Sequence, residues 1–85
     1  MAATPAHAVR ELIREFAETH GETFEAIVGP YKGHQLAEVR QQAMAHVKVT
    51  HPRMSLSRLG RHFNRHPTTV RYSLLTVGVS TRREA

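Results

Sequence analysis

The hydrophobic residues of this chain recur every three or four positions in several separate segments, which is the spacing of amphipathic helices. The first segment shows this period at five positions: Val9, Leu12, Ile13, Phe16 and Ala17. Thr4 is suited to cap this helix and Pro5 to occupy its first turn, while Gly21 is suited to end it. The pattern therefore predicts a first helix that begins at Thr4-Pro5 and ends near Gly21.

The middle of the chain carries the pattern of two more helices. Thr23 is a cap candidate for a short helix over residues 24–28, ahead of a loop at residues 29–33. Over residues 34–49 the period returns, with apolar residues at Leu36, Val39, Ala43, Met44 and Val47. We expect this longer third helix to end before Pro52.

Two shorter helices are predicted in the last third of the chain, with a tight turn between them. Ser55 is a cap candidate for the first helix, whose apolar stripe is Leu56, Leu59 and Phe63. Asn64 tolerates left-handed backbone and is suited to the turn, and Gly60 would let a neighbouring segment approach closely. The second helix starts at His66-Pro67 and ends before Gly78, with an apolar stripe of Val70, Leu74 and Val77.

No segment alternates apolar and polar residues as a strand does, and no internal repeat is visible. We therefore predict an all-α fold, with residues 1–79 in one bundle of four to five helices and residues 80–85 in a flexible tail. A chain of 85 residues, 40% apolar and without cysteine, fills one modest core by packing alone. No signal peptide or membrane-spanning run is visible, so we expect a soluble cytoplasmic protein.

Charge is distributed unevenly along the chain. Residues 1–38 contain three basic and six acidic residues, a net charge of −3, whereas residues 39–85 contain nine basic residues and the single acidic residue Glu84, a net charge of +8. The arginines of the second half alternate with apolar residues at helical spacing, which indicates a folded basic surface rather than a basic tail. Such a surface is expected to meet a polyanion.

A short helix, a tight turn and a second helix that begins with small polar residues form the layout of a helix-turn-helix DNA reader. When the apolar stripe of the second helix is taken as its buried side, a rotation of about 100° per residue places Thr68 and Tyr72 nearly opposite. Arg71 and Thr76 then lie on the flanks. Threonine and arginine can contact base edges, whereas three other arginines are better placed for phosphates: Arg58, Arg61 and Arg65.

Three segments of this region resemble, in order and at near-family spacing, the C-terminal DNA-binding domain of the bacterial replication initiator DnaA. They are VRQQAM at residues 39–44, MSLSRLGRHF at residues 54–63 and RHPTTV at residues 65–70. The family has an Ala-Arg-Gln-x-Ala-Met helix, a Ser-Leu-x-x-Ile-Gly-x-x-Phe helix and an Arg-Asp-His-Thr-Thr-Val signature. The resemblance covers roughly residues 9–78 and implies a Trp-repressor-like helical fold. No Gly-rich phosphate loop is present, so we expect neither nucleotide binding nor the family's ATPase.

The resemblance also implies roles for individual residues. Arg40 matches the family's arginine that enters the minor groove, and Arg65 matches the signature arginine near phosphate. Thr68 and Thr69 match the signature threonines, of which the first contacts bases in the major groove. The chain departs from the family at His66-Pro67, which replaces an Asp-His pair, at a residue missing before Arg65, and at Leu75-Thr76, where a basic pair is usual. The predicted DNA-binding residues are Arg40, Ser55, Arg58, Arg61, Arg65, His66, Thr68, Thr69, Arg71 and Tyr72.

Several of these assignments have a structural alternative. Arg40 lies within about 40° of Leu36 on its helix, so it could instead extend from the edge of the core. Tyr72 could pack on a neighbouring helix, and Leu75 could fill a side pocket or mark a dimer surface. Thr68 and Thr69 could be ordinary first-turn residues.

Seven histidines raise the question of a metal site, but their spacing does not favour one. His62 and His66 lie on either side of the predicted turn, and no cysteine or nearby carboxylate completes a tetrahedral set. Near phosphate, His51, His62 and His66 could instead become cationic and strengthen DNA binding as the pH falls. We predict no metal and no cofactor.

Taken together, these patterns favour a protein that binds double-stranded DNA in the nucleoid and controls transcription or replication or recognises a mobile-element site. No nucleophile–base pair, paired carboxylates or phosphate loop indicates an enzyme. The alternative is a protein-interaction module whose acidic first helix binds a partner. A homodimer is also left open.

Overall fold

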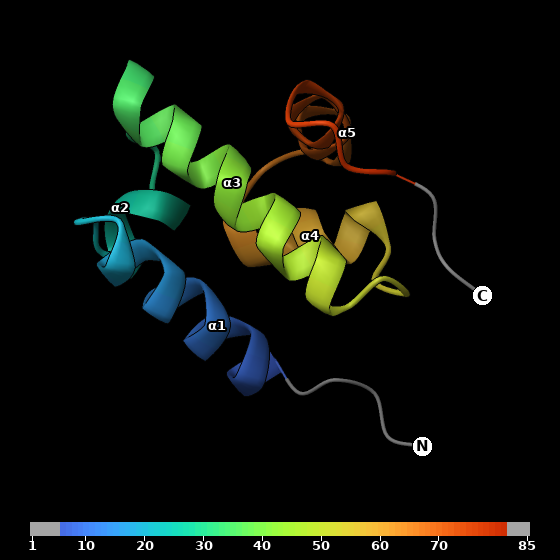
Figure 1. Cartoon of the computed structure of the whole chain (residues 1–85), viewed down its shortest axis with the longest axis horizontal. Coiled ribbons are helices and arrows are strands. Elements are labelled where there is room, and N and C mark those ends of the chain that lie inside the picture. Colours follow the sequence, from blue (N-terminus) through green and yellow to red (C-terminus); the bar gives the residue numbers. More distant parts are fainter. Residues whose placement is uncertain (1–5, 82–85) are drawn as a thin grey trace.

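The computed structural model describes residues 6–81, and in that range it contains five helices and no strand, which confirms the all-α prediction (Figure 1). The helices are α1 (Ala6–Thr19), α2 (Phe24–Val28), α3 (His34–Thr50), α4 (Leu56–Phe63) and α5 (Pro67–Thr76). The predicted helix start at Thr4-Pro5 and residues 82–85 of the predicted tail lie outside the described residues. No helix within residues 6–81 has the length and apolar character needed to cross a bilayer.

The ends of the helices follow the predicted capping residues. Thr23 Oγ1 accepts a hydrogen bond from the Ala26 amide at 3.1 Å, so it caps α2. Gly21, two residues after the end of α1, adopts a left-handed conformation with φ +77°, and the next amide, that of Glu22, returns to the Ala17 carbonyl at 2.8 Å. These contacts confirm the predicted end of the first helix and the predicted start of the second.

The buried hydrophobic residues form one core cluster, and α3 passes through its centre. This helix contacts each of the other four helices. Figure 1 shows it crossing the molecule, with α1 and α2 on one side and α5 on the other. The core residues are Val9, Ile13, Ala17, Ile27, Val39, Ala43, Met44, Val47, Met54, Leu59, Phe63, Val70 and Leu74.

The turn between α4 and α5 is closed by backbone hydrogen bonds and by two residues suited to it. Asn64 ends α4 in the left-handed region, with φ 55° and ψ 43°. The amide of Arg65 then returns to the Gly60 carbonyl at 2.9 Å. A Cβ on Gly60 would collide with the Arg65 carbonyl oxygen, so the close approach predicted at this glycine is confirmed.

Candidate nucleic-acid interface

The exposed face of α5 extends from the first turn of the helix to its last. The buried residues of this helix are Val70, Ser73 and Leu74. The stripe on the opposite side consists of Thr68, Tyr72 and Leu75, of which Tyr72 is 70% and Leu75 52% exposed. Neither side chain is buried against a neighbouring helix. Arg71, Thr69 and Thr76 are also exposed, so this face offers hydroxyl, guanidinium and apolar groups together.

His66 occupies the cap position of α5 and positions the first turn of that face. Its Nδ1 accepts a hydrogen bond from the Thr68 amide at 3.1 Å, which requires a ring without a proton on Nδ1. Pro67 follows at the first helical position, where a missing amide proton costs nothing. The His66-Pro67 pair therefore replaces a conventional polar cap with an imidazole cap.

On α4 the two arginines lie one helical turn apart but differ in exposure. Arg61 is exposed and Arg58 is half-buried. Ser55 Oγ accepts a hydrogen bond from the Arg58 amide at 3.1 Å, and this bond caps the helix. The structure thus gives Ser55 a capping role.

The carbonyl oxygens at the end of α2 and in the loop after it accept hydrogen bonds from side chains distant in the sequence. We refer to the oxygens of Ala26, Ile27, Val28, Gly29 and Tyr31 as the carbonyl cluster. Arg40 Nε donates to Ile27 O at 2.7 Å, and its Nη2 donates to Ala26 O at 3.3 Å and Tyr31 O at 2.9 Å. These donors satisfy carbonyls that the end of a helix leaves without intrahelical partners.

Arg40 is therefore buried, with 7% of its surface exposed, and it does not lie on the surface that the minor-groove assignment requires. Burial and the neighbouring Arg65 both lower the pKa of its guanidinium, in that order of importance. On the helical wheel Arg40 falls between Val47 and Met44, inside the apolar stripe of α3. This placement favours the structural alternative, an arginine at the core, over the minor-groove assignment.

Arg65 joins the turn to the same carbonyl cluster. Its Nη2 donates to Gly29 O at 2.8 Å, while its Nη1 donates to Phe63 O at 3.1 Å and to Asn64 O at 3.2 Å. Beside it, Asn64 Nδ2 donates to Val28 O at 3.1 Å. The predicted phosphate contact of Arg65 would compete with three intramolecular hydrogen bonds. We therefore assign this residue to holding the α4–α5 turn against the end of α2 rather than to a DNA contact.

The surface of the second half of the chain is basic even without Arg40 and Arg65. No aspartate or glutamate occurs between residues 39 and 81. Apart from Arg40 and Arg65, which bind the carbonyl cluster, the arginines in this range are Arg53, Arg58, Arg61 and Arg71. Of these four, only Arg58 is half-buried. These side chains give this part of the chain a positive charge.

Lys48 is a buried cation that sequence reasoning missed. Only 3% of its surface is exposed, and its Nζ donates to Pro52 O at 2.8 Å and Met54 O at 2.9 Å. These bonds hold the loop between α3 and α4. Its spacing of four residues from Met44 was the available signal, because residues four apart lie on one helix face.

Comparisons with models of protein families, with curated proteins and with solved structures give no match to this chain. Within residues 6–81 no group of three or more histidine or carboxylate side chains is placed to hold a metal ion.

Proposed function

We propose that this chain binds double-stranded DNA, with α4 and α5 acting as a helix-turn-helix of the DnaA type. In this proposal α5 enters the major groove and the arginines of α4 lie against the phosphate backbone. The observation that carries it is the exposed face of α5, which presents Thr68, Arg71 and Tyr72 in a part of the chain without carboxylates. The resemblance in three ordered motifs supports the same assignment.

Thr68, in the first turn of α5, is the proposed base reader. Thr68 lies at the N-terminal end of the exposed stripe, where its hydroxyl can bond a base edge and its methyl can pack on a thymine methyl. Arg71 on the flank can take guanine through two hydrogen bonds. Thr69 and Thr76, also exposed, are suited to the sugar-phosphate backbone.

Salt dependence tests the electrostatic part of the proposal. With about three phosphate contacts, from Arg53, Arg58 and Arg61, the slope of log K against log salt is expected to be about −3. Arg61→Gln should weaken binding to all sequences and flatten the slope by about one. Lys32→Gln removes the same charge from the exposed loop before α3 and should leave the slope unchanged.

Fluorescence anisotropy on random and on A/T-rich duplexes measures these slopes. A slope near zero for the wild-type chain would contradict DNA binding and favour the interaction module that uses the exposed glutamates of α1.

Base readout is tested on a site selected from a random duplex pool. Thr68→Val keeps the methyl and replaces the hydroxyl with a second methyl, whereas Thr68→Ala removes both groups beyond Cβ. If the hydroxyl reads a base, both variants should lose about 1 kcal/mol of discrimination at one position while non-specific affinity is retained. Unchanged base preference in both variants would remove Thr68 from the readout.

A further inference from the structure

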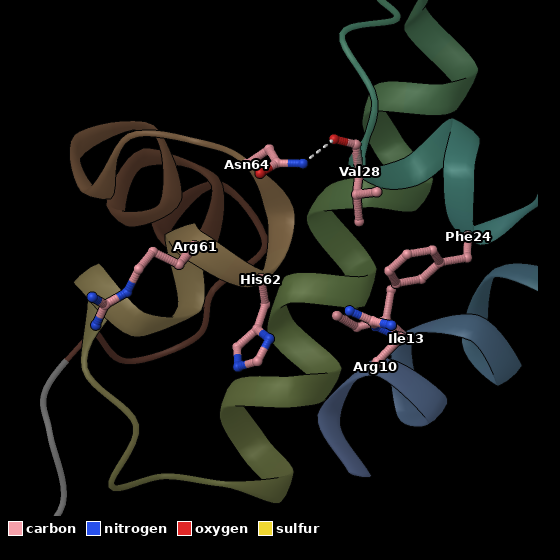
Figure 2. A pocket seen from close by; sticks show the side chains of 7 residues that line it. All are labelled: Arg10, Ile13, Phe24, Val28, Arg61, His62 and Asn64. Carbon is pink, nitrogen blue, oxygen red and sulfur yellow. Dashed lines mark hydrogen bonds between the residues drawn. The ribbon is translucent and has the colours of Figure 1, made fainter. Parts of the chain in front are cut away.

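A cavity lies where α1, α2 and α4 meet, next to the proposed DNA interface, with which it shares only Arg61. Its volume is about 220 Å³, and its lining includes Arg10 and Ile13 of α1, Phe24 and Val28 of α2, His62 of α4, and Asn64 of the turn. Figure 2 shows Arg10 and His62 pointing into the gap between α1 and α4, while Asn64 closes one end through its hydrogen bond to Val28. The Arg61 side chain also lines the cavity but extends away from Arg10.

Arg10 is an exposed residue at the edge of the cavity, and its guanidinium lies near an aromatic ring rather than a carboxylate. Its Cζ lies 5.9 Å from the centroid of the Phe24 ring, a cation–π contact that orients the guanidinium. Arg14 lies over the same ring at 5.3 Å, but its Nε also lies 3.5 Å from Glu11. Within residues 6–81 no carboxylate pairs with Arg10, and none of the described residues that line the cavity is acidic.

His62 faces this cationic side of the cavity. Burial lowers its pKa first, and the positive charges of Arg58 and Arg61 on its own helix, Arg10 on α1 and His51 after α3 lower it further. The groups that α2 contributes, Phe24 and Val28, carry no charge. The positive field at this position thus comes from three elements, and an anion placed there would relieve it.

We propose that this cavity binds a small organic anion, with its charged group between Arg10 and His62 and its apolar body against Phe24 and Val28. The guanidinium supplies charge-assisted donors to a carboxylate or a phosphate monoester. The half-buried ring and the valine side chain supply an apolar wall. The cavity is small, so the ligand is of single-ring size rather than a nucleotide. This inference does not depend on DNA binding.

Sodium benzoate is the probe, and two compounds separate the contributions of charge and ring. Benzamide has the same shape without the charge, and inorganic phosphate has the charge without the ring. Each is titrated into the full chain at about pH 6 and constant ionic strength, and backbone amide shifts are followed by NMR. We expect saturable shifts at the cavity residues with benzoate, and affinities at least about tenfold weaker for benzamide and phosphate.

Variants then assign the binding to the cavity. Arg10→Gln should weaken benzoate binding about tenfold or more, whereas Arg10→Lys should retain part of the affinity. Arg71→Gln removes an exposed arginine outside the cavity lining and should leave the affinity unchanged. In the wild-type chain, saturation with benzoate should raise the pKa of His62 toward its ordinary value.

Three results would overturn the proposal: absence of saturable shifts at the cavity, equal affinity for benzamide or phosphate, or full affinity in a folded Arg10→Gln protein. Circular dichroism establishes that each variant is folded.

Discussion

Two regions of this chain hold arginine side chains in opposite ways. At the carbonyl cluster Arg40 and Arg65 donate to backbone oxygens, whereas Arg61 on α4 and Arg71 on α5 extend into solvent. All four lie in the basic half of the sequence. The difference shows that an arginine's role is decided by whether backbone acceptors lie within its reach, not by the charge of the segment around it.

The reason lies in the shape of α2. A helix of five residues consists almost entirely of ends, so most of its carbonyls lack an intrahelical partner. Its C-terminal end also carries partial negative charge, which favours a cation. Within residues 6–81 no buried side-chain nitrogen or oxygen is left without a hydrogen-bond partner, so the cost of burying the Arg40 guanidinium is offset by its bonds.

The largest expected effect is the loss of stability in Arg40→Ala. This change removes a buried side chain together with its three hydrogen bonds and leaves the accepting carbonyls unpaired. We therefore expect the free energy of unfolding to fall by about 3 kcal/mol. Arg71→Ala, on the exposed face of α5, should change it by less than about 0.5 kcal/mol. Urea unfolding measures both. Wild-type stability in Arg40→Ala, combined with weaker binding to A/T-rich duplexes, would restore the minor-groove assignment and break the comparison.

Gly60→Ala tests whether turn closure is needed to bring Arg65 to the carbonyl cluster. The added methyl would collide with the Arg65 carbonyl, and relief of this contact should cost about 2 kcal/mol of unfolding free energy. Gly33→Ala is the matched control, because a Cβ there has no neighbour within 4 Å. Thermal and urea unfolding of the two variants give the difference. Equal stability would mean that the turn can open without loss.

His66 marks the boundary between the two regions, because it follows Arg65 and caps α5. His66→Ala should lose about 1 kcal/mol through the missing cap, and His66→Asn, which keeps a side-chain acceptor, should recover most of it. Urea unfolding measures the loss. Amide exchange at Thr68 should rise in the alanine variant first. If His66 has no capping role, the wild-type protein and both variants should have equal free energies of unfolding.

The smallest effect concerns pH. The folded pKa of His62 lies below its ordinary value of 6.5, so the unfolded chain binds more protons than the folded chain between the two values. This histidine therefore does not lower the free energy of unfolding above about pH 6.5. The free energy of unfolding falls as the pH drops toward the folded pKa. Arg10→Gln should raise this pKa, which histidine NMR titration measures directly. A His62 pKa that does not respond to Arg10 would mean that the Arg10 charge does not act on the imidazole.

The helix boundaries were largely predictable from the sequence because they depend on local chemistry. Thr23 and Ser55 accept hydrogen bonds from amides three residues away, and Asn64 ends α4 through its own left-handed backbone, so the structure confirms each of them. The exposed face of α5 followed from helical periodicity for the same reason. His66 was expected among the DNA-binding residues, yet its ring also serves as the cap of α5.

The carbonyl cluster was not predictable in this way, because its donors and acceptors are far apart in the chain. Arg40 reaches carbonyls 9 to 14 positions away, and Arg65 reaches one 36 positions away. Periodicity contains no information on such partners. The position of Arg40 inside the apolar stripe was the one local sign of its burial.

The 36-residue links from Asn64 and Arg65 to α2 also bear on the order in which the chain folds. A five-residue helix does not hold by itself in water, and its carbonyls gain these partners only after the α4–α5 turn has closed. We therefore expect α2 to become stable late in folding, because closing the long chain segment between these partners costs entropy. Substitutions in α2 should accelerate unfolding and leave the folding rate nearly unchanged.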